Sequence, residues 1–214
     1  EQIEFAIKSV VDEDRNLANI VIERDRKVDK YDLKVDKICQ KIFALNQPVA
    51  MDLRLIMSAL NINSNLERMG DIAVNIAENF LRLQQKPVFF ERTNFIQMSV
   101  TVREMIKNSI DSFIDRDAKL AEKVILMDSV LDKLFIENNQ IMIDIMKESI
   151  NNIDTAVLIL DMAKELERIG DHATNIAEDV FFIVEAQQVK HNYERFFFND
   201  SRNPEREKEE EDED

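Results

Sequence analysis

The chain has 214 residues, of which 45% are hydrophobic and 33% are charged, and its formal net charge is −15. This composition is sufficient to bury a core and is typical neither of a disordered tail nor of a membrane-spanning protein. Because so negative a chain repels phosphate backbones, we expect no direct binding of nucleic acid. Only two glycines and three prolines occur, which predicts long helices and an all-α fold.

The first half of the chain predicts three helices in succession. The chain does not begin with methionine, and comparison with its second half predicts that the first helix lacks roughly a dozen residues at its start. The second helix carries apolar residues at alternating steps of three and four, as in a coiled-coil seam. These residues are Val28, Tyr31, Val35, Ile38, Ile42 and Leu45. Pro48 marks a loop, and Asp52 is the predicted N-cap of the third helix.

The second half predicts the same three elements after Pro87, which separates the two units. Its long helix carries a second seam, in which Asn138 fills one gap. The seam residues are Leu120, Val124, Met127, Leu131, Leu134, Ile141 and Ile145. Asp154 is the predicted N-cap of the last helix.

An internal repeat relates the two halves. The stretch ERMGDIAVNIAEN at 67–79 matches ERIGDHATNIAED at 167–179 at nine of thirteen positions. Earlier residues recur at one constant offset: Ser9, Asp12, Asp14, Leu17, Ala18, Asp25 and Asp29 become Ser112, Asp115, Asp117, Leu120, Ala121, Asp128 and Asp132. We therefore expect two tandem pseudo-symmetric three-helix bundles, at residues 1–87 and 88–198, followed by an acidic disordered tail at 199–214.

Carboxylates gather on one face of the second helix of the first unit. On a helical wheel, Asp25, Asp29, Asp32 and Asp36 share a narrow sector, and Lys27, Lys30, Lys34 and Lys37 lie nearly opposite. Like charges at this spacing destabilise a helix unless a cation neutralises them. The third helix adds an oxygen-rich stripe of Glu67, Asp71, Asn75 and Glu78. Together the two stripes offer the hard oxygen ligands that divalent or ferric ions prefer.

The second unit keeps most of this oxygen set. It retains Asp128, Asp132, Glu167, Asp171, Asn175 and Glu178, and it replaces Asp32 and Asp36 by Phe135 and Asn139. The competing interpretations are a metal site and a solvated acidic face, and the residues alone leave both open. The two glycines, Gly70 and Gly170, fall inside the third helices, where they indicate close helix packing, room beside a bound ion, or both.

Other chemistries lack their motifs. Neither His172 nor His191 belongs to a Glu-x-x-His pair of the di-iron carboxylate bundles, and His172 is expected to be a packing histidine. The chain has no Gly-rich phosphate loop, nucleophile elbow or Cys-x-x-Cys pattern, so we expect no enzyme. The single cysteine, Cys39, is expected to be a buried thiol in a reducing compartment. With no signal peptide or membrane span, a cytosolic protein is expected.

Three stretches resemble the PhoU family of phosphate-uptake regulators: QPVAMDLR at 47–54, NLERMGDIAVNIAE at 65–78 and LERIGDHATNIAED at 166–179. The resemblance covers nearly the whole chain. It implies two three-helix bundles with multinuclear metal clusters, commonly of iron or zinc, held by paired acidic motifs. Those motifs correspond to Asp25 with Asp29, Glu67 with Asp71, Asp128 with Asp132, and Glu167 with Asp171.

The resemblance also implies a function in the bacterial cytoplasm. Members of the family act as negative regulators of phosphate-starvation signalling and phosphate import, through a sensor histidine kinase and the ATPase subunit of the phosphate transporter. Peripheral association with membrane complexes and a homodimer would be compatible with that role. The acidic tail and the run Phe196, Phe197 and Phe198 depart from the family. We interpret the run as a last packed helical turn in preference to a docking patch.

The leading hypothesis is a non-enzymatic signalling adaptor that acts on the kinase and the transporter. Two other functions compete with it. One is metal storage or buffering, and the other is a metal-free helical scaffold. A row of lysines, Lys27, Lys30, Lys34 and Lys37, is a candidate docking surface, for which a solvated face is the simpler interpretation. No residue set explains how the phosphate level is sensed.

Overall fold

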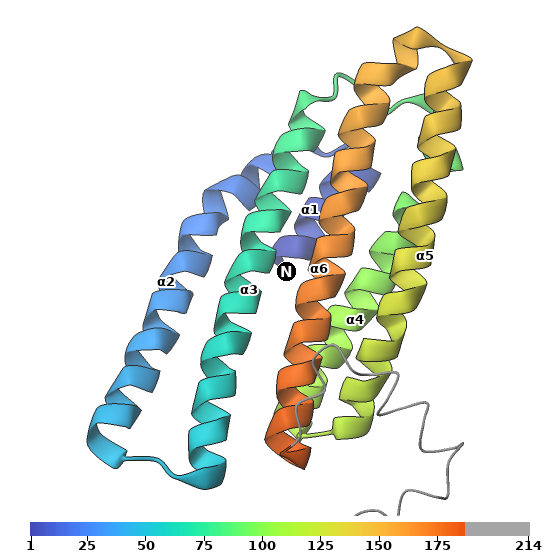
Figure 1. The fold of residues 1–214 in the computed structure, drawn as a ribbon. Coiled ribbons are helices and arrows are strands. Elements are labelled where there is room, and N and C mark those ends of the chain that lie inside the picture. The colour runs from blue at the N-terminus through green and yellow to red at the C-terminus, as the bar shows by residue number, and fades with distance from the viewer. Residues whose placement is uncertain (187–214) are drawn as a thin grey trace, which may run out of the picture.

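The computed structural model, in which residues 1–186 are described, is a bundle of long helices (Figure 1). The long helices are α1 (Gln2–Val11), α2 (Arg15–Asn46), α3 (Ala50–Arg82), α4 (Phe95–Asp115), α5 (Ala118–Glu148) and α6 (Ile153–Glu185). Two short 3-10 helices, η1 (Val88–Arg92) and η2 (Ile150–Asn152), lie in the connections before α4 and α6. The described residues contain no strand. The predicted all-α fold of two tandem three-helix units is thus confirmed.

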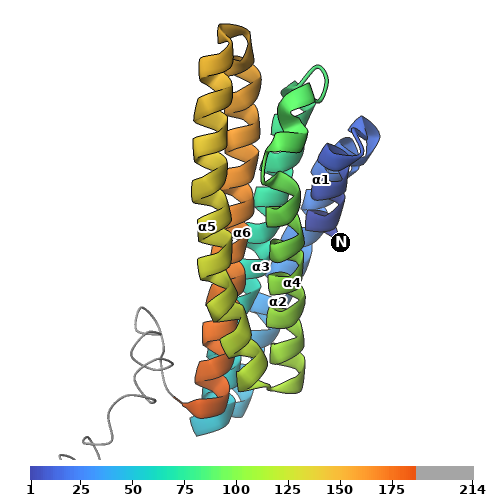
Figure 2. The same ribbon diagram turned by 90° about the vertical axis from the view of Figure 1, so that its right-hand side faces the viewer.

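The two units meet along their third helices. Figure 1 shows α3 and α6 side by side, with α2 flanking α3 and α5 flanking α6, and Figure 2 shows α1 and α4 on another side of this layer. The helices α3 and α6 run antiparallel, because Asn61 donates to Asp179 at 3.3 Å and Asn75 donates to Glu165 at 3.3 Å. The predicted division at residue 87 stays a prediction. The tail and the triple phenylalanine lie outside the described residues.

Two of the predicted helix caps are wrong. The helix α3 begins at Ala50 and α6 at Ile153, so Asp52 and Asp154 lie inside the first turns. There they complement the partial positive charge of the helix N-terminus without capping it. Aspartate caps occur instead at α2 and α5, where Asp14 accepts from the Leu17 amide at 3.0 Å and Asp117 from the Lys119 amide at 2.9 Å.

Each of the two glycines lies where a third helix packs against the long helix of its unit. A Cβ added at Gly70 would stand 3.0 Å from Cγ1 of Val28, and one added at Gly170 would overlap Cδ2 of Leu131. Val28 and Leu131 occupy equivalent positions on α2 and α5. The glycines therefore allow each third helix to close on its long neighbour, as the packing interpretation predicted. At Gly170 the cost of a glycine inside a helix, about 1 kcal/mol relative to alanine, is offset by this contact.

The coiled-coil seam of α2 is packed only in part. Tyr31, Ile38 and Leu45 are 64%, 49% and 70% exposed, whereas Leu131 and Ile145 of the second seam are fully buried. The helix α1 has 10 residues and α4 has 21. Among the described residues, no helix covers the later half of α2 as α4 covers α5.

Candidate metal centres

The first carboxylate cluster lies between α2 and α3. Burial, followed by the charges of Asp29 and Asp71, raises the pKa of Asp25 above its usual value. The pKa of Glu67 is likewise raised, by burial first and then by the charge of Asp71. Because each acid destabilises the charge of its neighbours, the paired motifs of α2 and α3 form one electrostatic unit. Gly70 and Val28, which precede Asp71 and Asp29 in the sequence, lie at the contact between the two helices.

The remaining acids of α2 continue this cluster along the helix. Burial and the neighbouring charges of Asp36 and Asp29 raise the pKa of Asp32. The side-chain amide of Asn63 donates to Asp32 Oδ1 at 2.8 Å and to Asp36 Oδ1 at 3.3 Å. A neutral donor on α3 therefore contacts both of these α2 acids. Within residues 1–186, none of the acids in the α2 stripe forms an ion pair with the lysines of α2.

The second cluster lies at the equivalent place between α5 and α6. Burial raises the pKa of Asp128 to about 6, and the charge of Asp132 adds to the effect. Burial raises the pKa of Glu167 to about 7, with further contributions from Asp171, Asp132 and Asp128. The pKa of Asp171 is raised by burial and then by the charge of Asp132. The charges of the four predicted acids of this unit therefore act on one another.

Arginines of the two ER-x-G-D stretches act differently in the two clusters. Arg68 lies 3.7 Å from Glu67 and 3.8 Å from Asp71, so it partly neutralises the first cluster. Its counterpart Arg168 forms a closer ion pair, at 2.7 Å, with Glu165. Within residues 1–186 the second cluster therefore lacks an equivalent direct ion pair, which agrees with the rise of the pKa of Glu167 to about 7.

One hydroxyl distinguishes the innermost acids of the two clusters. The Thr174 hydroxyl donates to Oδ1 of Asp128 at 3.2 Å. Val74 occupies the equivalent position on α3 and cannot donate. Oδ1 of the equivalent Asp25 is buried and has no hydrogen-bond partner among residues 1–186. A buried carboxylate oxygen without a donor is costly unless a cation or a bound water satisfies it.

The donor chemistry of both clusters fits a hard cation. Carboxylate oxygens are the ligands that divalent and ferric ions prefer, and a cation would remove the mutual repulsion that raises these pKa values. The unpartnered oxygen of Asp25 has the chemistry of a free ligand position. In residues 1–186, no group of three or more His, Cys, Asp or Glu side chains is gathered tightly enough to hold an ion as it stands. Binding would require the acids to turn toward a common point.

The additional oxygen ligands proposed from the sequence lie elsewhere on the third helices. Asn75 donates to Glu165 at 3.3 Å, and Asn175 donates to Asn65 at 3.4 Å, so both contact the other unit. Glu78 is exposed, whereas Glu178 is only 6% exposed. Their part in a metal site stays a prediction.

Two residues that were not predicted to be metal ligands, His172 and Cys39, are packed against the helices. His172 is half-buried, and its Nδ1 lies 2.8 Å from Oδ1 of Asn65 on α3, as expected of a packing histidine. Cys39 is a buried free thiol, also as expected. Sequence reasoning missed Asn63 and Thr174. The one available signal was the replacement of Val74 by Thr174, which is one of four mismatches in the aligned motif.

Comparison with known proteins agrees with this arrangement. The PhoU domain family model matches residues 1–80 and 95–180, once in each three-helix unit. The chain belongs to the PhoU family. A PhoU homolog of Aquifex aeolicus, described as a phosphate-specific transport system accessory protein, is 37% identical over 90% of this chain and 87% of its own length. The homolog of Deinococcus radiodurans, with the same description, is 36% identical over 84% of each chain.

A crystal structure of PhoU from Pseudomonas aeruginosa has the same fold. It superposes with a TM-score of 0.83 at 32% identity, covering 87% of this chain and 90% of that one. Among the described helices of this PhoU chain, none combines the length and the apolar character that crossing a membrane requires.

Proposed function

We propose that this PhoU chain is a non-enzymatic negative regulator of phosphate uptake and phosphate-starvation signalling that binds metal ions in its two carboxylate clusters. The regulatory role is supported by family membership and by relatives described as accessory proteins of phosphate transport. The metal is supported above all by Asp25, whose buried Oδ1 lacks a hydrogen-bond partner within the described residues and whose pKa is raised by burial and by the charges of Asp29 and Asp71. Iron and zinc are the proposed ions.

The residues proposed to hold the metal are the four paired motifs. In the first unit they are Asp25, Asp29, Glu67 and Asp71, with Asp32 and Asp36 extending the set. In the second unit they are Asp128, Asp132, Glu167 and Asp171. A bound cation would supply positive charge that draws α2 to α3 and α5 to α6. The metal then acts as a structural crosslink between helices.

The proposed partners are the phosphate-responsive sensor kinase and the ATPase subunit of the phosphate transporter, which the chain would reach from the cytoplasm. An adaptor of this kind needs a rigid surface, and crosslinked helices supply one. Co-purification of each partner with the chain, from cells grown in phosphate-rich medium, tests the assignment. Recovery of neither partner would contradict it.

Metal analysis tests the site directly. The variant Glu67→Ala, Asp71→Ala, Glu167→Ala and Asp171→Ala should lose bound iron and zinc and retain its helical circular dichroism. A matched variant removes the same number of carboxylates outside the clusters: Glu23→Ala, Glu122→Ala, Glu137→Ala and Asp161→Ala. It should keep the parental metal content. Negligible metal in both parent and cluster variant would favour the metal-free scaffold.

Gene deletion tests the regulatory role. In phosphate-rich medium, loss of the gene should make phosphate-starvation genes constitutive, and the intact gene should restore repression. The four-alanine cluster variant should fail to restore it, whereas the matched surface variant should succeed. Unchanged expression in the deletion strain, with metal still bound by the protein, would instead favour storage or buffering.

A further inference from the structure

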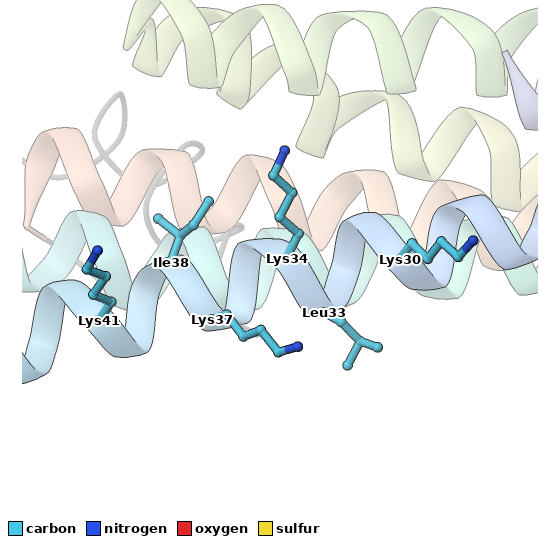
Figure 3. A pocket seen from close by; sticks show the side chains of 6 residues that line it. All are labelled: Lys30, Leu33, Lys34, Lys37, Ile38 and Lys41. Carbon is cyan, nitrogen blue, oxygen red and sulfur yellow. The ribbon is translucent and has the colours of Figure 1, made fainter.

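A row of lysines on α2 forms the surface from which the inference starts. The lysine face is lined by Lys30, Leu33, Lys34, Lys37, Ile38 and Lys41, which border one shallow hollow. Figure 3 shows that all six side chains project from α2. Leu33 and Ile38 are 54% and 49% exposed, so the face has an apolar centre between its charges. None of its four lysines forms an ion pair with residues 1–186.

The fold does not require this charge. The repeat offset places Lys133, Ile136, Glu137, Gln140, Ile141 and Asp144 at the equivalent positions of α5. Those residues carry one positive and two negative charges, a net of −1, whereas the lysine face carries +4. The equivalent position of the same fold therefore tolerates the opposite sign. In a chain of net charge −15, four unpaired lysines on one face form a local site for an anionic partner.

The chain itself contains a segment of complementary charge. Residues 205–214, here called the acidic segment, hold eight acids and two bases and carry a net charge of −6. The segment thus offers acids to the four lysines of the face.

The end of α6 lies beside the half of the molecule that carries the lysine face. Asn61 of α3 contacts Asp179 of α6, and Asn63 of α3 contacts Asp36 of α2. These contacts place Asp36 and Asp179 at nearly the same level along α3. Figure 1 accordingly shows the end of α6 and the α2–α3 connection at the same end of the bundle.

The intervening chain is long enough to span this separation. Two helix spacings between α6 and α2 amount to about 16–20 Å. The lysine face adds about one helix diameter, 10–12 Å, because it lies on the side of α2 opposite the aspartates that contact Asn63 of α3. Eighteen residues, 187–204, precede the acidic segment. Fully extended, eighteen residues reach about 60 Å. Because this reach exceeds the separation, residues 205–214 can meet α2 of the same chain, which raises their local concentration there.

We propose that the acidic segment at residues 205–214 docks on the lysine face of α2 of the same chain. The docked segment thereby covers a basic surface that would otherwise be open to an acidic external partner. This inference does not depend on metal binding or on the regulatory role, since it uses only the charge of α2 and the position of the end of α6.

Paramagnetic broadening in the full chain tests the docking. A nitroxide is attached at Glu210→Cys in a Cys39→Ala background, so that only residue 210 is labelled. Amide signals of residues 30–41 should broaden at low ionic strength, whereas those of 133–144, the equivalent stretch of α5, should not. The broadening should be lost at about 1 M salt, where the screening length falls to about 3 Å.

Charge-reversal variants test whether docking of the acidic segment requires the lysines of α2. Lys34→Glu with Lys37→Glu should abolish the broadening of residues 30–41. The matched pair Lys119→Glu with Lys133→Glu changes net charge equally and should leave the broadening intact. Equal broadening of both stretches, or broadening unaffected by the α2 pair, would overturn the proposal.

A mixing experiment identifies the occupant. Chains that carry the nitroxide but no ¹⁵N are mixed with ¹⁵N-labelled chains that carry no nitroxide. Absence of broadening in the ¹⁵N chains is expected for docking within one chain. Broadening of their residues 30–41 would assign the acidic segment to a second copy and overturn the intramolecular contact. Binding of phosphatidylserine vesicles by the intact chain through the lysine face, without broadening by the label, would overturn it as well.

Discussion

The replacement of Gly170 by alanine tests how the second cluster is held together. The added methyl group would overlap Cδ2 of Leu131, and Met105 Cε stands 3.6 Å away on another side. Leu131 is fully buried, so its side chain has no solvent to move into. Overpacking of this kind costs roughly 1–3 kcal/mol. Alanine returns about 1 kcal/mol of helix propensity, so the net loss of unfolding free energy should be about 1–2 kcal/mol.

The equivalent replacement in the first unit is the matched control. At Gly70 the methyl group would stand 3.0 Å from Cγ1 of Val28, which is only half-buried and can yield. The gain in helix propensity then dominates, and Gly70→Ala should be neutral or stabilising by up to about 1 kcal/mol. The two chemically identical changes should therefore have opposite or clearly separated effects.

Thermal and urea unfolding of the metal-free chain, followed by circular dichroism, measures both variants. For a chain of this size, each kcal/mol corresponds to a shift of Tm of about 2–4 °C. Adding Leu131→Val to Gly170→Ala removes the overlapping methyl group and should recover part of the loss. If Gly170→Ala proves as stable as Gly70→Ala, the close approach of α5 and α6 is not what the glycine serves.

The remaining predictions concern the acids of the clusters and one connection between helices. Thr174→Val removes the donor to Asp128 and should destabilise the metal-free chain by about 1–2 kcal/mol at neutral pH. The reciprocal Val74→Thr can donate to Asp25 and should stabilise it, and equal effects of the two changes in urea unfolding would contradict the assigned hydrogen bond. The pKa values of Asp128 and Glu167, raised to about 6 and about 7, predict an unusual pH dependence. Their charged forms destabilise the folded state, a penalty that is complete above about pH 7 and is relieved as the pH falls toward the ordinary values near 4. These groups should therefore make the metal-free chain more stable at about pH 5 than at about pH 8, by roughly 1 kcal/mol each after solvent screening. Asp128→Asn and Glu167→Gln should each flatten that dependence, and an unchanged profile would refute the burial of these charges. Arg15 donates to the carbonyls of Leu83 and Leu81 at 2.8 and 2.6 Å, so Arg15→Ala should cost about 1–2 kcal/mol, while Arg26→Ala, an exposed control, should cost little in the same assay.

The fold was largely predictable because the repeat and the apolar period are properties of the sequence itself. The spacing of Val28, Tyr31 and Val35 identifies one face of a helix, and the aligned ER-x-G-D stretches identify equivalent third helices. Periodicity does not identify what covers a face. Tyr31 has the pattern of a core residue, yet it is exposed because no described helix lies over it.

The candidate site was predictable at the level of faces and not of individual contacts. Grouping Asp128 with Asp132 and Glu167 required only helical geometry and the repeat. The hydrogen bond from Thr174 to Asp128 depends on the rotation of α6 against α5, which no spacing along one chain encodes. The caps at Asp52 and Asp154 failed for a related reason, since α3 and α6 begin three residues and two residues earlier than N-caps at these aspartates predict.

The polar contacts between α3 and α6 fix the position of one helix along the other. Asn61 with Asp179, Asn65 with Asn175, and Asn75 with Glu165 share a single antiparallel register. A slip of one helical turn, about 5.4 Å, would separate all three pairs at once, whereas an apolar interface could slide and repack. The spacing between the two carboxylate clusters is consequently fixed along the molecule. A partner that touches both units meets them at one defined distance.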